Sequence, residues 1–194
     1  MAQLLLLTLR GTPTCYYGDE LGLMDVEIPP DKLQDPAGLQ QPGVKGVGRD
    51  PERTPMQWDA GPNAGFCAPG VEPWLPVAPD YQAHNVAREE QDSRSLLTLF
   101  RRLTALRRAT PALYSGSYES YPLDAVPVLA YTRRHAQERV LIALNFGDTA
   151  QLLNFGQLGG QGRVLLSTEL DREGAEDLAQ FQLRAHEGVI VEPG

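Results

Sequence analysis

The sequence predicts two fold classes in one chain, an α/β segment followed by an all-β segment. Residues 2–10 are apolar and rich in helix formers, and residues 14–17 are β-branched or aromatic and end at Gly18. This order predicts a helix, a sharp break and a short buried strand. From about residue 118 onward, short apolar runs alternate with polar turns. That spacing is typical of a small antiparallel β-sandwich.

The clearest predicted helix covers residues 93–109. Arginines occupy one face, and Pro111 follows the end. We expect Asp92 or Ser93 to cap the first turn, and we expect the apolar stripe to pack on the sheet that contains the strand at residues 14–17. The stripe repeats at helical spacing: Leu96, Leu99, Phe100, Leu103 and Leu106.

The β-segment begins with a predicted hairpin. Residues 128–132 and 140–144 are apolar runs separated by a polar turn at residues 133–138. Three more apolar runs predict further strands at residues 152–155, 163–167 and 188–191.

Between the two segments, residues 19–91 show little periodicity and are dense in proline and glycine. A stretch of this length inside a compact domain is either disordered or functional. Its tryptophans, tyrosines, valines and leucines make it too apolar for disorder. We therefore predict an ordered functional loop.

Composition excludes several classes of function. A net charge of −8 argues against nucleic acid or an anionic membrane as a partner. No apolar run approaches the ~20 residues that span a bilayer, and the leucine-rich start is a poor secretion signal. Cys15 and Cys67 are expected to be reduced thiols of a cytoplasmic protein. His84, His135 and His186 lie far from other ligand-type residues, so no metal and no cofactor is predicted.

Several runs resemble a known family. GTPTCYYGDELG (residues 11–22) resembles the eighth strand and following turn of the glycoside hydrolase family 13 barrel, in the α-amylase superfamily. GRDPERTPMQWD (residues 48–59) resembles a signature of its α-glucosidase and oligo-1,6-glucosidase branch. The same pattern continues at residues 63–66, 73–77 and 85–86, and the runs at 166–168 and 187–192 are similar to the C-terminal β-domain.

The resemblance implies a partial (β/α)8 TIM barrel followed by a small antiparallel β-sandwich domain. Residues 1–110 would form the C-terminal end of the catalytic barrel, comprising the end of helix 7, strand 8, a long loop and helix 8. Residues 111–194 would form the C-terminal β-domain. Because active sites of such barrels lie in the loops after the strands, the long loop would lie on the catalytic face.

The catalytic residues of this family are expected to lie outside the chain. Retaining glycosidases need two carboxyl groups ~5–5.5 Å apart. The resemblance places the nucleophilic Asp, the acid/base Glu and a third Asp on strands 4, 5 and 7, all before Met1. We therefore assign no catalytic residue, and we expect the chain alone to be an inactive fragment, produced by gene truncation, a frameshift or the choice of expressed segment.

Three residues are predicted to bind substrate: Arg49, Arg53 and Glu20. A guanidinium can bridge two sugar hydroxyls or hold a carboxylate, and the resemblance implies that one arginine of the motif reaches the glucose. Arg49 is slightly favoured over Arg53, and the alternative is an Arg–Asp network that stiffens the loop. For Glu20 the alternative is anchoring of the loop. Trp58 and Trp74 could stack on sugar, but burial within the loop is expected.

Two classes of function remain open. The first is a fragment of an α-glucosidase that releases terminal α-linked glucose from short oligosaccharides with retention, with trehalose synthase or sucrose isomerase as alternatives within the family. Its partners would be an oligosaccharide or small α-glucoside and the missing N-terminal barrel portion. The second is a non-enzymatic carbohydrate-binding or interaction module at residues 111–194. Its aromatic platform would have to come from four tyrosines: Tyr114, Tyr118, Tyr121 and Tyr131.

Overall fold

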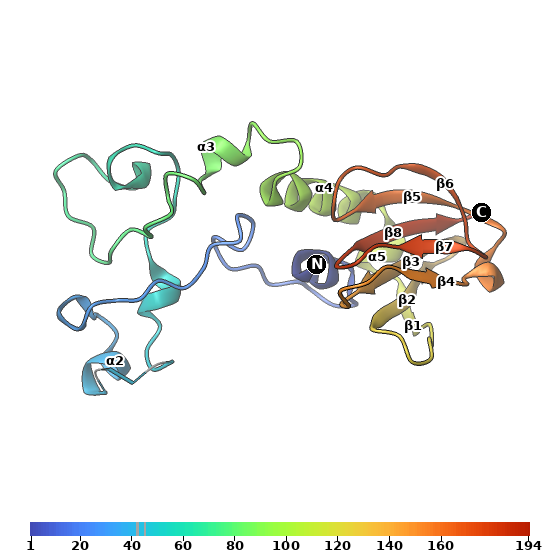
Figure 1. The fold of residues 1–194 in the computed structure, drawn as a ribbon, viewed down its shortest axis with the longest axis horizontal. Helices are drawn as coiled ribbons and strands as arrows, with labels where there is room; N and C mark the ends of the chain where they lie inside the picture. The colour runs from blue at the N-terminus through green and yellow to red at the C-terminus, as the bar shows by residue number, and fades with distance from the viewer. Residues whose placement is uncertain (42, 45) are drawn as a thin grey trace. The chain divides into compact units, whose positions relative to one another are not determined.

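The computed structural model describes residues 1–41, 43–44 and 46–194, and it divides into two compact units (Figure 1). One unit combines Met1–Cys15 with Leu99–Gly194, and the other is Tyr16–Thr98. The predicted boundary at residue 110 separates a barrel from a β-domain and stays a prediction. In the described residues no helix is long and apolar enough to cross a membrane.

The first unit contains two antiparallel sheets. The larger has the strand order β1-β2-β3-β8-β5-β6, and the smaller pairs β4 with β7. The predicted strands are confirmed in position, while β1, β6 and β7 were not predicted individually. The bounds are β1 (Ser117–Ser120), β2 (Val128–His135), β3 (Glu138–Asn145), β4 (Gln151–Leu153), β5 (Gln161–Ser167), β6 (Gly174–Asp177), β7 (Phe181–Leu183) and β8 (Gly188–Pro193).

The hairpin β2–β3 follows the prediction closely. Its strands pair antiparallel from Val128 with Asn145 to His135 with Glu138. Ala136 in the connecting turn has a φ of 51°, the left-handed conformation that a two-residue hairpin turn requires. The hairpin is therefore confirmed, but its turn is only Ala136 and Gln137, because residues 133–135 continue β2 and Glu138 begins β3.

One face of the large sheet packs against the small sheet. Strand alternation points Leu141 and Ala143 of β3 toward this face, where they meet Phe181 and Leu183 of β7. The rings of Phe155 and Phe181 meet edge to face with their centroids 5.8 Å apart. The two sheets thus share one apolar core, as a two-layer sandwich does.

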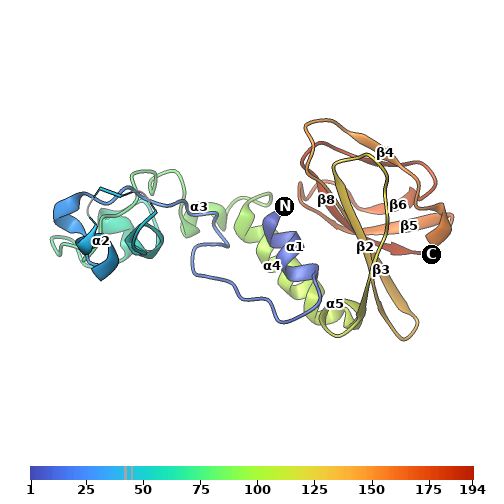
Figure 2. The ribbon, with the colours of Figure 1, turned by 90° about the horizontal axis from the view of Figure 1, so that it is seen from below.

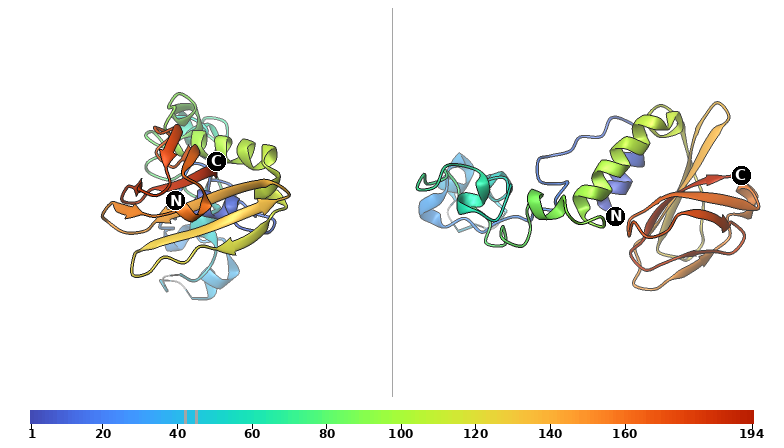
Figure 3. Two further views of the ribbon diagram at one scale, coloured as in Figure 1. Left: turned by 90° about the vertical axis from the view of Figure 1, so that its right-hand side faces the viewer. Right: turned by 90° about the horizontal axis from the view of Figure 1, so that it is seen from above.

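Helices cover the other face of the large sheet. They are α1 (Ala2–Thr8), α5 (Pro111–Tyr114) and the part of α4 (Leu96–Ala109) that lies in this unit. Figures 2 and 3 show α1 beside α4. Leu4 of α1 and Leu99 and Leu103 of α4 are buried in a cluster with Ile142 of β3. The predicted helix 93–109 is confirmed, but its apolar stripe packs on the antiparallel sheet and not on a strand at residues 14–17.

The C-terminal end of α1 is held by buried side chains of β2. Arg133, which is 0% exposed, donates hydrogen bonds to the carbonyl oxygens of Thr8 (2.6 Å), Gly116 (2.9 Å) and Ser117 (3.1 Å). The hydroxyls of Thr8 and Tyr131 lie 2.6 Å apart. The last carbonyls of a helix lack partners within the helix, so a cation placed there both satisfies them and complements the helix dipole.

A bulge interrupts the pairing of β5 with β8. Val164 pairs with Val191, but the next paired residue is Leu166, which faces Ile190. Val164 and Val191 pack in the core shared with the small sheet, whereas Leu166 and Ile190 pack in the core under the helices. The extra residue, Leu165, therefore shifts the alternation of the strand by one position.

The second unit, Tyr16–Thr98, consists of short helices joined by loops. This agrees with the prediction of an ordered loop for residues 19–91, apart from the two positions outside the described residues. The helices are two-turn or shorter, and each begins at a proline or beside one except α3. They are the 3-10 helices Pro30–Lys32, Asp50–Arg53 and Pro62–Gly65 and the α-helices α2 (Pro36–Gln40) and α3 (Val86–Glu89).

The predicted buried strand at residues 14–17, which would be strand 8 of the barrel, is wrong for this structure. Thr14–Tyr17 form no strand, and Tyr16 and Tyr17 are 47% and 42% exposed. β-branched and aromatic residues favour a strand only where neighbouring strands receive their hydrogen bonds. Within the described residues no strand pairs with this segment, and the N–H of Tyr16 donates instead to the carboxylate of Asp19 at 2.9 Å.

The cap of α4 also differs from the prediction. The helix begins at Leu96, and the hydroxyl of Ser95 accepts the N–H of Thr98 at 3.1 Å. Asp92 caps the preceding turn by accepting the N–H of Arg94 at 2.8 Å. A second acceptor comes from α3, where Oε2 of Glu89 accepts the N–H of Leu97 at 2.9 Å. The capping residue is therefore Ser95, aided by Glu89.

Glu89 makes the stability of this unit depend on pH. Burial raises the pKa of Glu89 above its ordinary value, although the N–H of Leu97 lowers it in part. A raised folded-state pKa means that stability is fully present below the unfolded pKa and falls as pH rises through the folded pKa. Glu89→Gln keeps an acceptor for Leu97 and removes the charge, so we expect a smaller loss of stability between about pH 4 and pH 7.

Urea unfolding of the wild type and Glu89→Gln at both pH values measures this difference. Glu27→Gln is the control, because it removes one negative charge from an exposed position of the same unit. An equal loss of stability in the wild type and Glu89→Gln would be incompatible with the expected effect of burial.

Candidate functional site

The second unit contains an aromatic cleft of about 510 Å³. Its residues come from three stretches that are distant in sequence, at 16–20, 53–66 and 74. Both tryptophans of the chain belong to it. The lining residues are Tyr16, Tyr17, Glu20, Arg53, Thr54, Met56, Trp58, Phe66 and Trp74.

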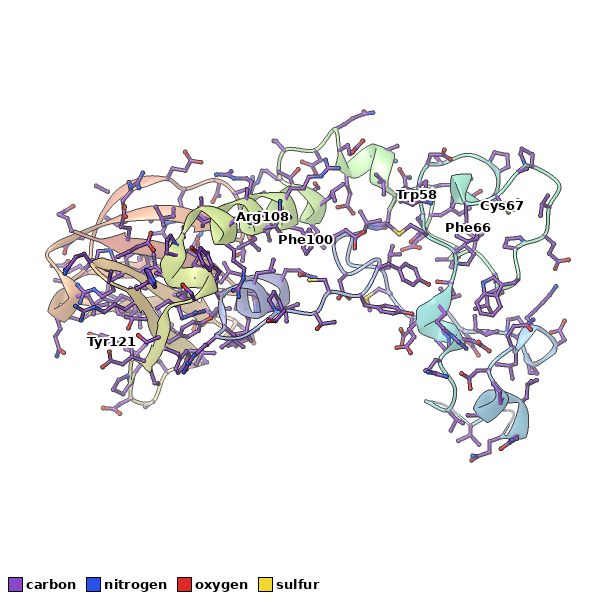
Figure 4. All side chains as sticks on the ribbon, turned by 180° about the vertical axis from the view of Figure 1, so that it is seen from behind. Trp58, Phe66, Cys67, Phe100, Arg108 and Tyr121 are labelled. Atoms are coloured by element: carbon purple, nitrogen blue, oxygen red, sulfur yellow. The ribbon has the colours of Figure 1, made fainter. Side chains whose placement is uncertain are left out.

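The aromatic side chains of this cleft are half exposed. Trp58, Phe66 and Trp74 are 49%, 43% and 51% exposed. The expectation that both tryptophans are buried in the loop is therefore wrong. Figure 4 shows Trp58 and Phe66 near each other on one loop, with Cys67 beside them. Exposed aromatic surface of this kind marks a place where a ligand can bind.

The loop that carries Trp58 and Phe66 has a specific backbone geometry. Asn63 and Ala64 both have a φ of 54°, which turns the chain back so that the N–H of Trp58 donates to the carbonyl of Ala64 at 2.8 Å. The amide of Asn63 donates to the carbonyl of Val71 at 2.8 Å. Gly65 has a φ of 68°, and a Cβ there would lie 2.6 Å from the Asp59 carboxylate. These contacts hold the indole of Trp58 on the outside of the loop.

Arg53 is the cation of the cleft. Its Nη2 donates to Asp50 at 2.8 Å and to Asp35 at 3.0 Å, and its Nε donates to the carbonyl of Arg49 at 3.3 Å. Its guanidinium carbon lies 5.6 Å from the ring centroid of Trp74, within cation–π range. The predicted Arg–Asp network therefore exists, and Arg53 also reaches the cleft.

Asp50 anchors this network from a fully buried position. Its Oδ2 accepts the N–H groups of Gln34 at 2.6 Å and Asp35 at 2.7 Å, while its Oδ1 binds Arg53. Burial alone would raise the pKa of Asp50, but the hydrogen bonds from the two backbone N–H groups and from Arg53 lower it below its ordinary value. Asp50 is therefore charged at neutral pH and fixes the position of Arg53.

The other two predicted substrate-binding residues differ in position. Glu20 lines the cleft together with Arg53, and its Oε2 accepts the N–H of Gly18 at 2.8 Å. Arg49 does not line the cleft. Its side chain is 71% exposed, and its Nε lies 3.3 Å from the carboxylate of Asp35. The structure thus brings Glu20 and Arg53 together and leaves Arg49 outside, while the role of each in binding stays a prediction.

Tyr17 connects the cleft wall to the motif at residues 48–59. Its hydroxyl donates to the carbonyl of Thr54 at 2.9 Å, and burial raises its pKa above the ordinary value. It therefore stays neutral at physiological pH. Glu20 is the only carboxylate among the lining residues of the cleft.

Sequence reasoning missed Tyr16, Tyr17, Phe66 and Asp35 as members of this region. The carboxylate of Asp35 accepts hydrogen bonds from both Arg49 and Arg53. The density of aromatic residues in a loop rich in proline and glycine was the available signal for the others. The described residues contain no group of three or more potential metal ligands. Cys15, which is exposed, and Cys67, which is partly buried, form no disulfide in the described part of the chain.

The four tyrosines proposed for a platform on residues 111–194 do not form a single surface. Tyr131 is fully buried and its ring lies 5.0 Å from that of Tyr118. Tyr121, labelled in Figure 4, meets the ring of Phe155 at 5.2 Å in the core shared by the two sheets. Tyr114 is 52% exposed on α5. The aromatic cleft of the second unit is therefore the better candidate for a sugar-binding surface.

Comparisons with known proteins show which enzymes this chain is similar to. A probable α-glucosidase of Rhizobium meliloti is 40% identical over 147 residues, which cover 75% of this chain and 26% of that protein. The oligo-1,6-glucosidase of Parageobacillus thermoglucosidasius is 29% identical over 201 residues, covering 94% of this chain and 35% of that protein. The trehalulose synthase MutB of Pseudomonas mesoacidophila superposes with a TM-score of 0.81 at 30% identity, covering 98% of this chain and 37% of the solved one.

The chain thus spans about a quarter to a third of the length of the curated relatives it matches. The family model described as the α-amylase catalytic domain matches residues 1–116, which is more than half of the chain. On the strength of that match and of its glucosidase relatives, the chain belongs to the α-amylase family.

Proposed function

We propose that this chain is the sugar-holding C-terminal portion of an α-glucosidase, and that the catalytic carboxylates come from a segment outside it. The complete enzyme would release terminal α-linked glucose from short oligosaccharides with retention of configuration. Relatives named α-glucosidase and oligo-1,6-glucosidase support this substrate class.

The aromatic cleft is the observation that carries the proposal. The C–H face of a pyranose ring stacks on an aromatic side chain, and its hydroxyls need charged or polar partners at the edge. Trp58 and Trp74 offer the aromatic surface, and Arg53 and Glu20 offer a donor and an acceptor. The described hydrogen bonds of Arg53 use Nε and Nη2, which leaves Nη1 for a sugar hydroxyl.

The same proposal covers the domain organisation. We assign residues 1–110 to the end of a catalytic (β/α)8 barrel and residues 111–194 to the C-terminal β-domain. Two observations support this assignment: helices α1 and α4 occur in the two stretches for which the resemblance implies helices, and the family match ends at residue 116. Residues 14–17 would correspond to strand 8 of the barrel, which forms only beside the neighbouring strands of a complete barrel.

The isolated chain is expected to bind maltose but not to hydrolyse p-nitrophenyl α-glucoside, because its cleft has a single carboxylate. Binding can be followed by intrinsic fluorescence, since both tryptophans line the cleft. Arg53→Ala should weaken maltose binding about tenfold. Arg49→Ala, at an arginine outside the cleft, should weaken it less. Hydrolysis by the pure chain that disappears with Arg49→Ala or Arg53→Ala would refute the expected inactivity.

A second candidate is sugar isomerisation. The similarity to solved trehalulose synthase structures over 98% of the chain favours it. Assembling the chain with the N-terminal part of the Rhizobium meliloti relative and analysing the products from maltose and sucrose distinguishes the two. Free glucose as the main product supports the glucosidase, whereas a rearranged disaccharide supports trehalose synthase or sucrose isomerase activity.

A further inference from the structure

Two side-chain contacts join residues 32–34 to residues 72–74. Lys32 forms an ion pair with Glu72, and Nε2 of Gln34 donates to the carbonyl of Trp74 at 3.4 Å. Each contact links residues 40 positions apart, and the second lies two residues after the first on both segments. The segments therefore run side by side in the same direction. We refer to Lys32, Gln34, Glu72 and Trp74 as the latch.

The latch is anchored to the same buried carboxylate that holds Arg53. The backbone N–H of Gln34 donates to Oδ2 of Asp50, and Oδ1 of Asp50 accepts from Arg53. Through Gln34, the main chain at Trp74 is thus fixed with respect to Asp50. This arrangement places the Trp74 ring 5.6 Å from the guanidinium carbon of Arg53.

We infer that Trp74 is a sugar-stacking residue of the cleft and that the latch is the device that positions it over Arg53. The inference rests on the proposed function, because it assigns an α-glucoside ring as the ligand. Trp74 lines the cleft while half of its surface is exposed, so aromatic surface remains for a pyranose. The guanidinium of Arg53 lies over one face of the Trp74 ring, so a pyranose would stack on the opposite face.

The contacts of the latch differ in chemical type, so each can be removed by a different substitution. The backbone bond from Gln34 to Asp50 is independent of the Gln34 side chain, so Gln34→Ala removes the contact to Trp74 and keeps the anchor. Lys32 and Glu72 are exposed, with side chains 42% and 75% accessible, so their pairing is sensitive to salt and to charge reversal. Charge reversal at either residue places like charges opposite each other, and reversal at both restores attraction.

The test uses the full chain with Trp58→Phe, which leaves Trp74 as the only tryptophan. Acrylamide quenching of the unliganded protein reports the exposure of Trp74. Lys32→Glu, Glu72→Lys and Gln34→Ala should each raise quenching, by up to about twofold because the indole is already 51% exposed. The double variant Lys32→Glu/Glu72→Lys should return quenching to the parent value. Asp31→Lys, a charge reversal next to the latch, serves as the control.

Maltose titrations of the same proteins test the role in binding. The latch variants should bind maltose more weakly than the parent, and the double variant should recover. In the wild-type background Trp74→Ala should weaken maltose binding about tenfold by calorimetry. Sorbitol, which has hydroxyls but no ring to stack, should not bind.

The outcomes separate the inference from the proposed function. Unchanged quenching in all three latch variants, with maltose still bound, would overturn the latch alone. Quenching that follows the latch while no form of the chain binds maltose would refute both the proposed function and the assignment of Trp74 to sugar. Quenching that rises and maltose affinity that falls in the latch variants, with both values recovering in the double variant, support the inference.

Discussion

Replacing Asp50 with alanine is expected to abolish maltose binding by the cleft. The carboxylate is fully buried and receives Arg53 and the N–H groups of Gln34 and Asp35. Its removal leaves the buried N–H of Asp35 without an acceptor, at a cost of about 1–3 kcal/mol, and the partly buried N–H of Gln34 loses its acceptor as well. It also releases the guanidinium and the anchor of the latch. We expect maltose affinity to fall by about a hundredfold or more.

Calorimetric titration with maltose measures this loss. Asp31→Ala removes a carboxylate from an exposed position of the same unit and should leave affinity within about twofold. Circular dichroism of both variants checks that the fold is retained. Maltose affinity close to that of the wild type in a folded Asp50→Ala protein would disprove the role assigned to this carboxylate.

Arg133→Met is expected to destabilise the first unit by about 3–5 kcal/mol, since hydrogen bonds to a charged group contribute about 1.5–3 kcal/mol each and are not additive. Methionine keeps much of the apolar stem but removes the donor from the buried carbonyls of Thr8 and Gly116 and from the partly buried carbonyl of Ser117. The end of α1 should therefore detach first from the sheet.

Urea unfolding followed by circular dichroism measures the effect of Arg133→Met. Arg134→Met is the matched control, because Arg134 is the next residue of β2 and its side chain is exposed. Its expected change is below about 0.5 kcal/mol. Equal stability of the two variants would mean that the buried arginine contributes nothing through its three carbonyl partners.

The β-segment was the most predictable part of the fold. The runs at residues 128–132 and 140–144 and the polar residues between them specify a hairpin through contacts that are local in sequence. The short strand β7 was not predicted because residues 181–183 have too few positions to show alternation, and its pairing with β4 joins residues about 30 positions apart.

The errors occurred where a local pattern depends on distant partners. Thr14–Tyr17 has the composition of a strand, yet strand formation needs neighbours that the sequence of this segment does not specify. Helix α4 was predicted in place, but the sequence could not show that its apolar stripe faces β3. The helix is capped by Ser95 and not by the predicted Asp92 or Ser93, and Glu89 of α3 supplies a second acceptor from outside the helix.

The predicted role of the arginines in substrate binding stays a prediction. The Arg–Asp network, which was the alternative to substrate contact, is present in the structure. The sequence could not show that Arg53 reaches the cleft and Arg49 does not, because this depends on Asp35, which binds both. The exposure of Trp58 follows from the left-handed backbone at Asn63 and Ala64, and a β-carbon-bearing residue such as Ala64 gives no sequence signal for that conformation.

The bulge at Leu165 makes the residues of β5 before and after it pack in two different cores. Before it, inward residues such as Val164 serve the core between the sheets, and after it Leu166 serves the core beneath the helices. The length of β5 is therefore as tightly constrained as its composition. Deleting one residue at this position would turn the side chains of the following residues of β5 to the opposite face of the sheet. Relatives should therefore vary in the side chain at this position but keep the number of residues between the turns that flank β5.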